Sequence, residues 1–151
     1  SEAAKAEHSF QPAEREQFVL DLNHSDTLDL QQVRGIGEVR AGRIYRYGKK
    51  LGGYVSVNQL KEVYGINEEL FEQIKSHFVV TDARIRKIDI NSDDVKYLAS
   101  HPYIDFQLAK ALIRYRKEYK KDFERPEDIR NIHFLSKEEC EKLLPYIKTK
   151  D

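Results

Sequence analysis

The chain repeats itself, and this duplication constrains the fold more than any other feature of the sequence. The segment from Leu20 to Asn23 returns in a similar form from Ile88 to Asn91. At the same spacing Ala41 matches Ala109, and after one inserted residue Tyr54 matches Phe123 and Glu69 and Glu72 match Glu138 and Glu141. A repeat of this length is a supersecondary unit present in two copies. We therefore expect two tandem units with one architecture.

Each copy carries the pattern of about four helices, so the predicted fold class is all-α. A short helix is expected near residues 25–32, with its repeat near 93–100. A longer one is expected near 38–51, with its repeat near 106–121. The expected N-caps are Asn23 and Asn91 for the first helices, Asn67 for the last helix of copy one, and Ser136, with Glu139 as its capping-box partner, for that of copy two.

The repeat also divides the chain. We expect an N-terminal arm at residues 1–18, a first unit at 19–80 and a second unit at 81–151. Residues 78–90 are rich in β-branched side chains with partial alternation. This pattern is typical of an extended segment that pairs locally.

Composition limits the classes of function. The chain has 26 basic and 26 acidic residues and a formal net charge of zero, so any DNA binding must come from a local patch. No apolar run is long enough for a membrane helix and no signal peptide is recognisable, but the chain lacks methionine, so a lost N-terminal anchor is conceivable.

Residue types suited to catalysis or metal binding form no recognisable constellation. The single cysteine, Cys140, takes the place of Phe71 in the repeat and is expected to pack in the core. The five histidines show no metal-ligand spacing, and the carboxylates follow ordinary helix surfaces. We therefore expect no catalytic residue, no metal site and no enzyme activity.

The seven glycines are confined to the first unit, between Gly35 and Gly65. In the segment from Val33 to Gly37, Gly35 can take the positive φ that ends a helix, and Gly37 lets a ligand approach the next helix. Free N–H groups at that helix N-terminus favour an anion such as phosphate. In the second unit the equivalent segment reads His101-Pro102-Tyr103-Ile104-Asp105, without glycine and with an acid at its end.

The pattern from Val33 to Ala41, apolar-x-Gly-apolar-Gly-x-x-x-Ala, resembles the helix-hairpin-helix DNA-binding motif. Together with Val63-Tyr64-Gly65-Ile66 it is similar to the tandem domain of the ComEA competence DNA receptors. The resemblance implies sequence-independent binding to the DNA backbone, no cofactor except a monovalent cation at hairpin carbonyls, and the extracytoplasmic part of an anchored bacterial protein.

The long helix of the first unit has two faces. We expect Ala41, Ile44, Tyr45 and Gly48 to face inward and Arg40, Arg43, Tyr47 and Lys50 to face outward. This basic stripe is either a phosphate-binding patch or an ordinary solvated helix face. The candidate DNA phosphate-binding residues are Arg34, Gly35, Ile36, Gly37, Val39, Arg40, Arg43, Lys49, Lys50, Gly65 and Ile66.

In the second unit, Leu108, Ala111 and Glu118 replace the basic residues of that stripe. Leu108, Ala111 and Tyr115 are therefore the candidate partner surface, and the alternative function is a protein-interaction scaffold with little DNA affinity. The basic residues of the second long helix, Arg116 among them, are expected in solvent. Most aromatic side chains of the first unit are expected to be buried or half-buried, and a base-stacking role has no specific support. The aromatic residues of that unit are Tyr45, Tyr47, Tyr54, Tyr64, Phe71 and Phe78.

Overall fold

The structure is a computed structural model that describes residues 18–82 and 84–150. Most of the arm expected at 1–18 therefore lies outside the described residues. The described residues form two compact units by packing, one made of 18–47 and 54–82 and the other of 48–53 and 84–150. Both are helical with only very short strands, so the all-α prediction is confirmed. The division into an arm at 1–18 and units at 19–80 and 81–151 stays a prediction.

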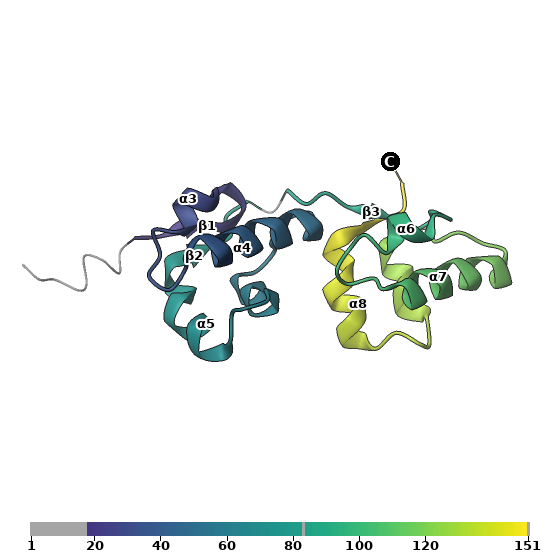
Figure 1. Cartoon of the computed structure of the whole chain (residues 1–151). Helices are drawn as coiled ribbons and strands as arrows, with labels where there is room; N and C mark the ends of the chain where they lie inside the picture. Colours follow the sequence, from purple (N-terminus) through teal and green to yellow (C-terminus); the bar gives the residue numbers. More distant parts are fainter. Residues whose placement is uncertain (1–17, 83, 151) are drawn as a thin grey trace, which may run out of the picture. The chain divides into compact units, whose positions relative to one another are not determined.

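The first unit is built around one long helix, α4, with shorter helices near it (Figure 1). The N-cap prediction for Asn67 is confirmed, because its side chain accepts a hydrogen bond from the N–H of Leu70. The elements are β1 (Leu20–Asp21), a 3-10 turn (Leu22–His24), α3 (Thr27–Leu30), α4 (Glu38–Leu51), a 3-10 helix (Val57–Glu62), α5 (Glu68–Ile74), a 3-10 turn (Lys75–His77) and β2 (Phe78–Val79). The core includes Leu30, Val33, Ile36, Ala41, Ile44, Tyr54, Leu60, Val63, Phe71, Ile74 and Phe78.

The second unit repeats this order around its own long helix, α7. The capping box of Ser136 and Glu139 is confirmed, and Cys140 is buried as expected. The elements are β3 (Ile88–Asp89), α6 (Val95–Leu98), α7 (Phe106–Tyr119), a 3-10 helix (Pro126–Asn131), α8 (Lys137–Leu143), a 3-10 turn (Leu144–Tyr146) and β4 (Ile147–Lys148). The core includes Ile90, Leu98, Ile104, Ala109, Leu112, Phe123, Ile129, Ile132, Cys140, Leu143 and Ile147. None of the described helices, in either unit, has the length and apolar character needed to cross a bilayer.

A two-stranded parallel ribbon joins the start of each unit to its end. Leu20 pairs with Phe78 in the first unit, and Ile88 pairs with Ile147 in the second. Residues 78–90 thus supply one strand to each ribbon, at their two ends. The expectation of an extended, paired segment is confirmed at its two ends, but the expectation that it pairs locally is wrong, because each strand pairs with the far end of its own unit.

The expected N-caps of the first helices are wrong by three residues. Asp26 caps α3 and Asp94 caps α6, each by accepting a hydrogen bond from a backbone N–H of the first helical turn. Aspartate suits this position because its carboxylate satisfies a free N–H and lies at the positive end of the helix dipole. Asn23 and Asn91 lie three residues before these caps, and their side chains bind a loop backbone instead.

Each of these two asparagines binds the backbone of the single aromatic residue in its unit's loop. The Asn23 amide donates to the Tyr54 carbonyl and accepts from the Tyr54 N–H, both at 2.8 Å. Asn91 does the same with Phe123, at 3.0 and 2.9 Å. An asparagine side chain can pair with a backbone in this way because its NH2 group donates while its carbonyl oxygen accepts. The pairing fixes the loop after each long helix, which places that helix in its unit.

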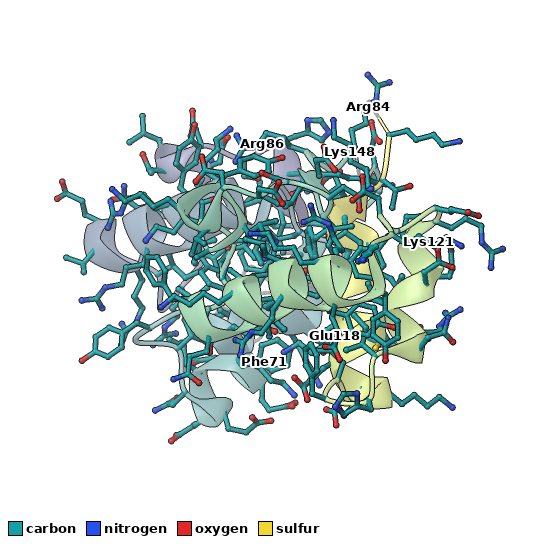
Figure 2. The ribbon with its side chains drawn as sticks, turned by 90° about the vertical axis from the view of Figure 1, so that its right-hand side faces the viewer. Phe71, Arg84, Arg86, Glu118, Lys121 and Lys148 are labelled. Carbon is teal, nitrogen blue, oxygen red and sulfur yellow. The ribbon has the colours of Figure 1, made fainter. Side chains whose placement is uncertain are left out.

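The prediction that Arg116 is solvated is also wrong. Its side chain is only 7% exposed, and the guanidinium donates to the Ser92 carbonyl at 2.8 Å, to Asp93 at 2.6 Å and to Asp122 at 3.2 Å. A buried guanidinium needs such partners because its donors lose water. Glu118 and Lys121, on and just after α7 and labelled in Figure 2, are exposed as expected.

Most of the aromatic side chains expected to be buried or half-buried in the first unit are so, but the inward position expected for Tyr45 is wrong. Tyr45 is 40% exposed, although it was expected on the inward face of α4. Tyr64 is 81% exposed, because it lies in the turn between the 3-10 helix and α5. Tyr54, Phe71 and Phe78 are buried as expected.

Candidate nucleic-acid interface

The structure contains four equivalent turns, two in each unit, that lead into α4, α5, α7 and α8. Each is closed by a hydrogen bond from the N–H of its fourth residue to the carbonyl of its first. The four bonds are Ile36 to Val33 (3.0 Å), Ile66 to Val63 (3.1 Å), Ile104 to His101 (3.0 Å) and Leu135 to Ile132 (3.2 Å). The fourth residue is buried in every case and anchors the turn in the core.

The two units differ in the backbone of these turns. In the first unit, Gly35 and Gly65 hold the third position with φ of 101° and 94°. This sign of φ is the one a type II turn requires at that position, and it favours glycine. In the second unit, Tyr103 and Phe134 hold the same position without a positive φ. The central peptide of the turn is therefore oriented differently in the two units.

The helix N-termini after these turns differ in a way that bears directly on anion binding. The residues before α5, α7 and α8 are Asn67, Asp105 and Ser136, and each side chain accepts a hydrogen bond from a backbone N–H of its own helix, at 2.8, 2.7 and 3.0 Å. The residue before α4 is Gly37, whose carbonyl accepts the first bond of the helix from Ala41 at 2.9 Å but which has no side chain to cap it. A Cβ built on Gly37 would meet nothing within 4 Å. Of these four helices, α4 is the one whose N-terminal amides are not capped by the side chain of the preceding residue.

In the turn before α7, a side chain of the turn also accepts a hydrogen bond from a backbone N–H of the same turn. The N–H of Tyr103 donates to Nδ1 of His101 at 3.0 Å. In the first unit the residue at the place of His101 is Val33, which is buried and has no acceptor in its side chain. The substitution of His101 and Asp105 for Val33 and Gly37 therefore replaces two candidate ligand contacts with internal hydrogen bonds.

Arg40 connects the two turns of the first unit. Its guanidinium donates to the Gly65 carbonyl at 3.0 Å and to the Gly35 carbonyl at 3.3 Å. It holds two turns that are separated in sequence close to the start of α4. Those two carbonyls already accept from a cation, so the monovalent cation that the resemblance implies would have to bind other hairpin carbonyls, and it stays a prediction.

The remaining candidate phosphate-binding residues do not form one cluster. Arg34 is exposed in the first turn and Val39 is exposed after it. The side chains of Ile36 and Ile66 are buried and their N–H groups close the turns, so these two residues serve as turn anchors. Lys49 and Lys50 are exposed in the last turn of α4, about 17 Å along the helix from its first amides at 1.5 Å per residue. By packing, these two lysines belong with the second unit.

The residues of the candidate partner surface are partly buried within the second unit. Leu108, Ala111 and Tyr115 are half-buried, and Leu108 and Tyr115 pack against the core of that unit. The more exposed apolar side chains nearby are Phe106 (56%) and Tyr119 (61%), which sequence reasoning missed. Helical periodicity gives no signal for the exposure of Phe106, because Phe106 precedes the buried Ala109 by three residues and the buried Ile113 by seven and so lies on their side of α7.

The single cysteine of the chain, Cys140, is buried. Burial raises the pKa of the Cys140 thiol, which favours its neutral form. Among the residues that the structure describes, no group of three or more histidine, cysteine, aspartate or glutamate side chains could hold a metal ion.

Comparison with protein families identifies the fold. A model described as the helix-hairpin-helix motif matches residues 16–79 and again residues 83–148. The chain belongs to the helix-hairpin-helix family. Such motifs are generally associated with nonspecific DNA binding. Comparisons with curated proteins and with solved structures give no match.

Proposed function

We propose that this protein is a non-catalytic DNA-binding module that contacts the phosphate backbone through the first turn of its first unit. The observation that carries the proposal is the N-terminus of α4, where Gly37 leaves the helix amides without the side-chain cap that Asn67, Asp105 and Ser136 supply elsewhere. Amides at the start of a long helix favour an anion through hydrogen bonds and the helix dipole.

The charge around this helix start supports the same proposal. Arg34 is exposed in the turn itself, and Arg40 adds positive charge beside both turn carbonyls. A phosphate at the α4 amides would then lie among fixed cations, although the chain as a whole is neutral. Contacts of this kind read no base edges, so binding is independent of sequence.

The finer likeness to the ComEA receptors, and with it a role in DNA uptake during competence, belongs to the same proposal. It has the two-turn pattern of the first unit as its support. In this proposal the second unit has a supporting role, because its turns bind their own amides.

The test is a titration of fluorescently labelled duplex DNA at a series of salt concentrations. Each phosphate contact releases counterions, so Kd should rise steeply with salt. Arg34→Glu should weaken binding and make the salt dependence shallower by about one unit of slope. Arg114→Glu carries the same change in charge on an exposed residue of α7 and is the matched control. A flat salt response, or equal losses in the two variants, would contradict the proposal.

The alternative function, a protein-interaction scaffold, has one specific observation in its favour, the exposure of Phe106 and Tyr119 on a helix of the second unit. It predicts an oligomer or a partner complex that Phe106→Glu disrupts. Phe106 is a better probe than Leu108, because Leu108 packs against the core and its substitution would also affect folding. Size-exclusion chromatography of the wild type and Phe106→Glu distinguishes the two functions.

A further inference from the structure

The second turn of the first unit presents an aromatic ring where the first presents a cation. Arg34 and Tyr64 occupy the same position in their turns, between a buried valine and a glycine of positive φ. Tyr64 is 81% exposed, more than any other large hydrophobic side chain that is exposed in the described part of the chain. An exposed tyrosine at the apex of a turn contributes little to the core, so its position calls for another explanation.

The ring is held in place from α4. The guanidinium carbon of Arg43 lies 4.8 Å from the centroid of the Tyr64 ring, which is the geometry of a cation–π contact. A Cβ at residue 65 would lie 2.8 Å from the Arg43 guanidinium, so Gly65 leaves the room that this contact needs. Arg40, one turn earlier in α4, fixes the Gly65 carbonyl. The ring therefore lies against the Arg43 guanidinium, on the side of the second turn that faces α4.

We propose that Tyr64, backed by Arg43, is a stacking site for an unpaired base of the DNA strand whose phosphate binds at α4. This inference rests on the proposed function. One side of the ring faces Arg43, and its high exposure leaves surface on which a base can lie. Bases stack on aromatic rings and guanidinium planes without regard to sequence, as a nonspecific binder requires. The two arginines favour a nucleic acid over a neutral apolar partner, because they place positive charge next to the ring.

The consequence is a preference for unpaired DNA. In a duplex each base is already stacked between its neighbours and must leave the stack before it can contact the ring. In a single strand the base is available at little cost. The first unit should therefore bind a single strand or a gapped duplex more tightly than an intact duplex of the same length.

The experiment uses the full chain and two labelled strands of equal length, an oligothymidine and a strand made only of abasic sites. Both carry the same phosphates, so the difference in Kd measured by fluorescence anisotropy isolates the bases. We expect the wild type to bind oligothymidine roughly tenfold more tightly than the abasic strand. Tyr64→Ala should remove this difference and keep the abasic affinity, and Tyr64→Phe should keep the difference.

Tyr119→Ala is the matched control, because it removes an exposed tyrosine from the second unit. It should leave the preference for oligothymidine intact. Equal binding of the two strands by the wild type, or a preference that survives in Tyr64→Ala, would overturn the stacking site and leave the phosphate-binding proposal standing. Binding of neither strand would overturn the stacking site, and if the intact duplex is not bound either, the proposed function is overturned with it.

Discussion

Filling the N-terminus of α4 gives the sharpest test of where phosphate binds. Gly37→Asp gives α4 the same N-cap residue that α7 has in Asp105. The Asp105 carboxylate accepts a hydrogen bond from the N–H of Leu108 at 2.7 Å. The new side chain has room, since a Cβ at Gly37 meets nothing within 4 Å, and Gly37 does not have a positive φ. The variant should therefore fold, with its own carboxylate in the position proposed for phosphate.

Stability and binding should change in opposite directions. An aspartate N-cap improves on glycine by a few tenths of a kcal/mol, and its charge at the helix dipole adds to this, for a gain of about 0.5–1 kcal/mol. In a unit of this size that corresponds to roughly 3–6 °C in Tm. DNA binding should lose a charge-assisted hydrogen bond of about 1.5–3 kcal/mol, which raises Kd at least tenfold.

Two further substitutions at Gly37 separate the effect of capping the helix from the effect of the added charge. Gly37→Asn caps the helix without a charge, so it should raise Tm and weaken DNA binding less than Gly37→Asp does. Gly37→Ala adds a Cβ without a cap, so it should lower Tm slightly and affect Kd least. Thermal unfolding and anisotropy titrations on the same samples measure both effects. A Gly37→Asp variant with higher Tm and unchanged Kd would show that the α4 amides are not the phosphate site.

Other predictions concern the second unit. Lys120 has a φ of 51° at the place of Gly52 in the repeat, so Lys120→Gly should raise the free energy of unfolding by about 0.5–1 kcal/mol in a denaturant titration. The backbone N–H of Arg125 holds the pKa of Asp128 below its usual value, so the carboxylate's contribution to stability should be lost as pH falls through that lowered pKa. Asp128→Asn should lower Tm at neutral pH and show a smaller further drop between about pH 5 and pH 2 than the wild type. Burial raises the pKa of Cys140, so its thiol should react with a disulfide reagent at neutral pH only after denaturant is added, and fast reaction of the native protein would contradict its buried position.

The long helix of the first unit was predictable because every signal for it is local. The expected range 38–51 is the range of α4, since the apolar period, the glycine before it and the turn after it are all read within a few residues. The buried anchor at Ile36 and the positive φ of Gly35 follow from the same short motif. Local chemistry also identified Asn67 and Ser136 as caps.

Long-range hydrogen bonds were beyond sequence reasoning. Asn23 was a reasonable N-cap by residue type, but its amide pairs with the backbone of Tyr54 instead. Asparagine serves both tasks with the same two groups, and only the fold decides which partner is near. The burial of Arg116 was missed for the same reason, because its partners Ser92 and Asp93 come from a distant part of the chain.

The structure also changes what a mutation of the basic stripe can prove. A double variant with glutamate at Arg40 and Arg43 reverses two charges, but it also removes the hydrogen bonds to the Gly35 and Gly65 carbonyls and the contact with the Tyr64 ring. A loss of DNA binding in that variant would follow equally from a lost phosphate contact and from displaced turns. The side chain of Arg34 is exposed at the turn apex, and Gly37 has none, so their substitution changes charge or amide occupancy while the turn anchors stay buried. DNA binding by variants at these two positions, with Arg114→Glu as the control, therefore reports on the proposed phosphate site and not on displaced turns.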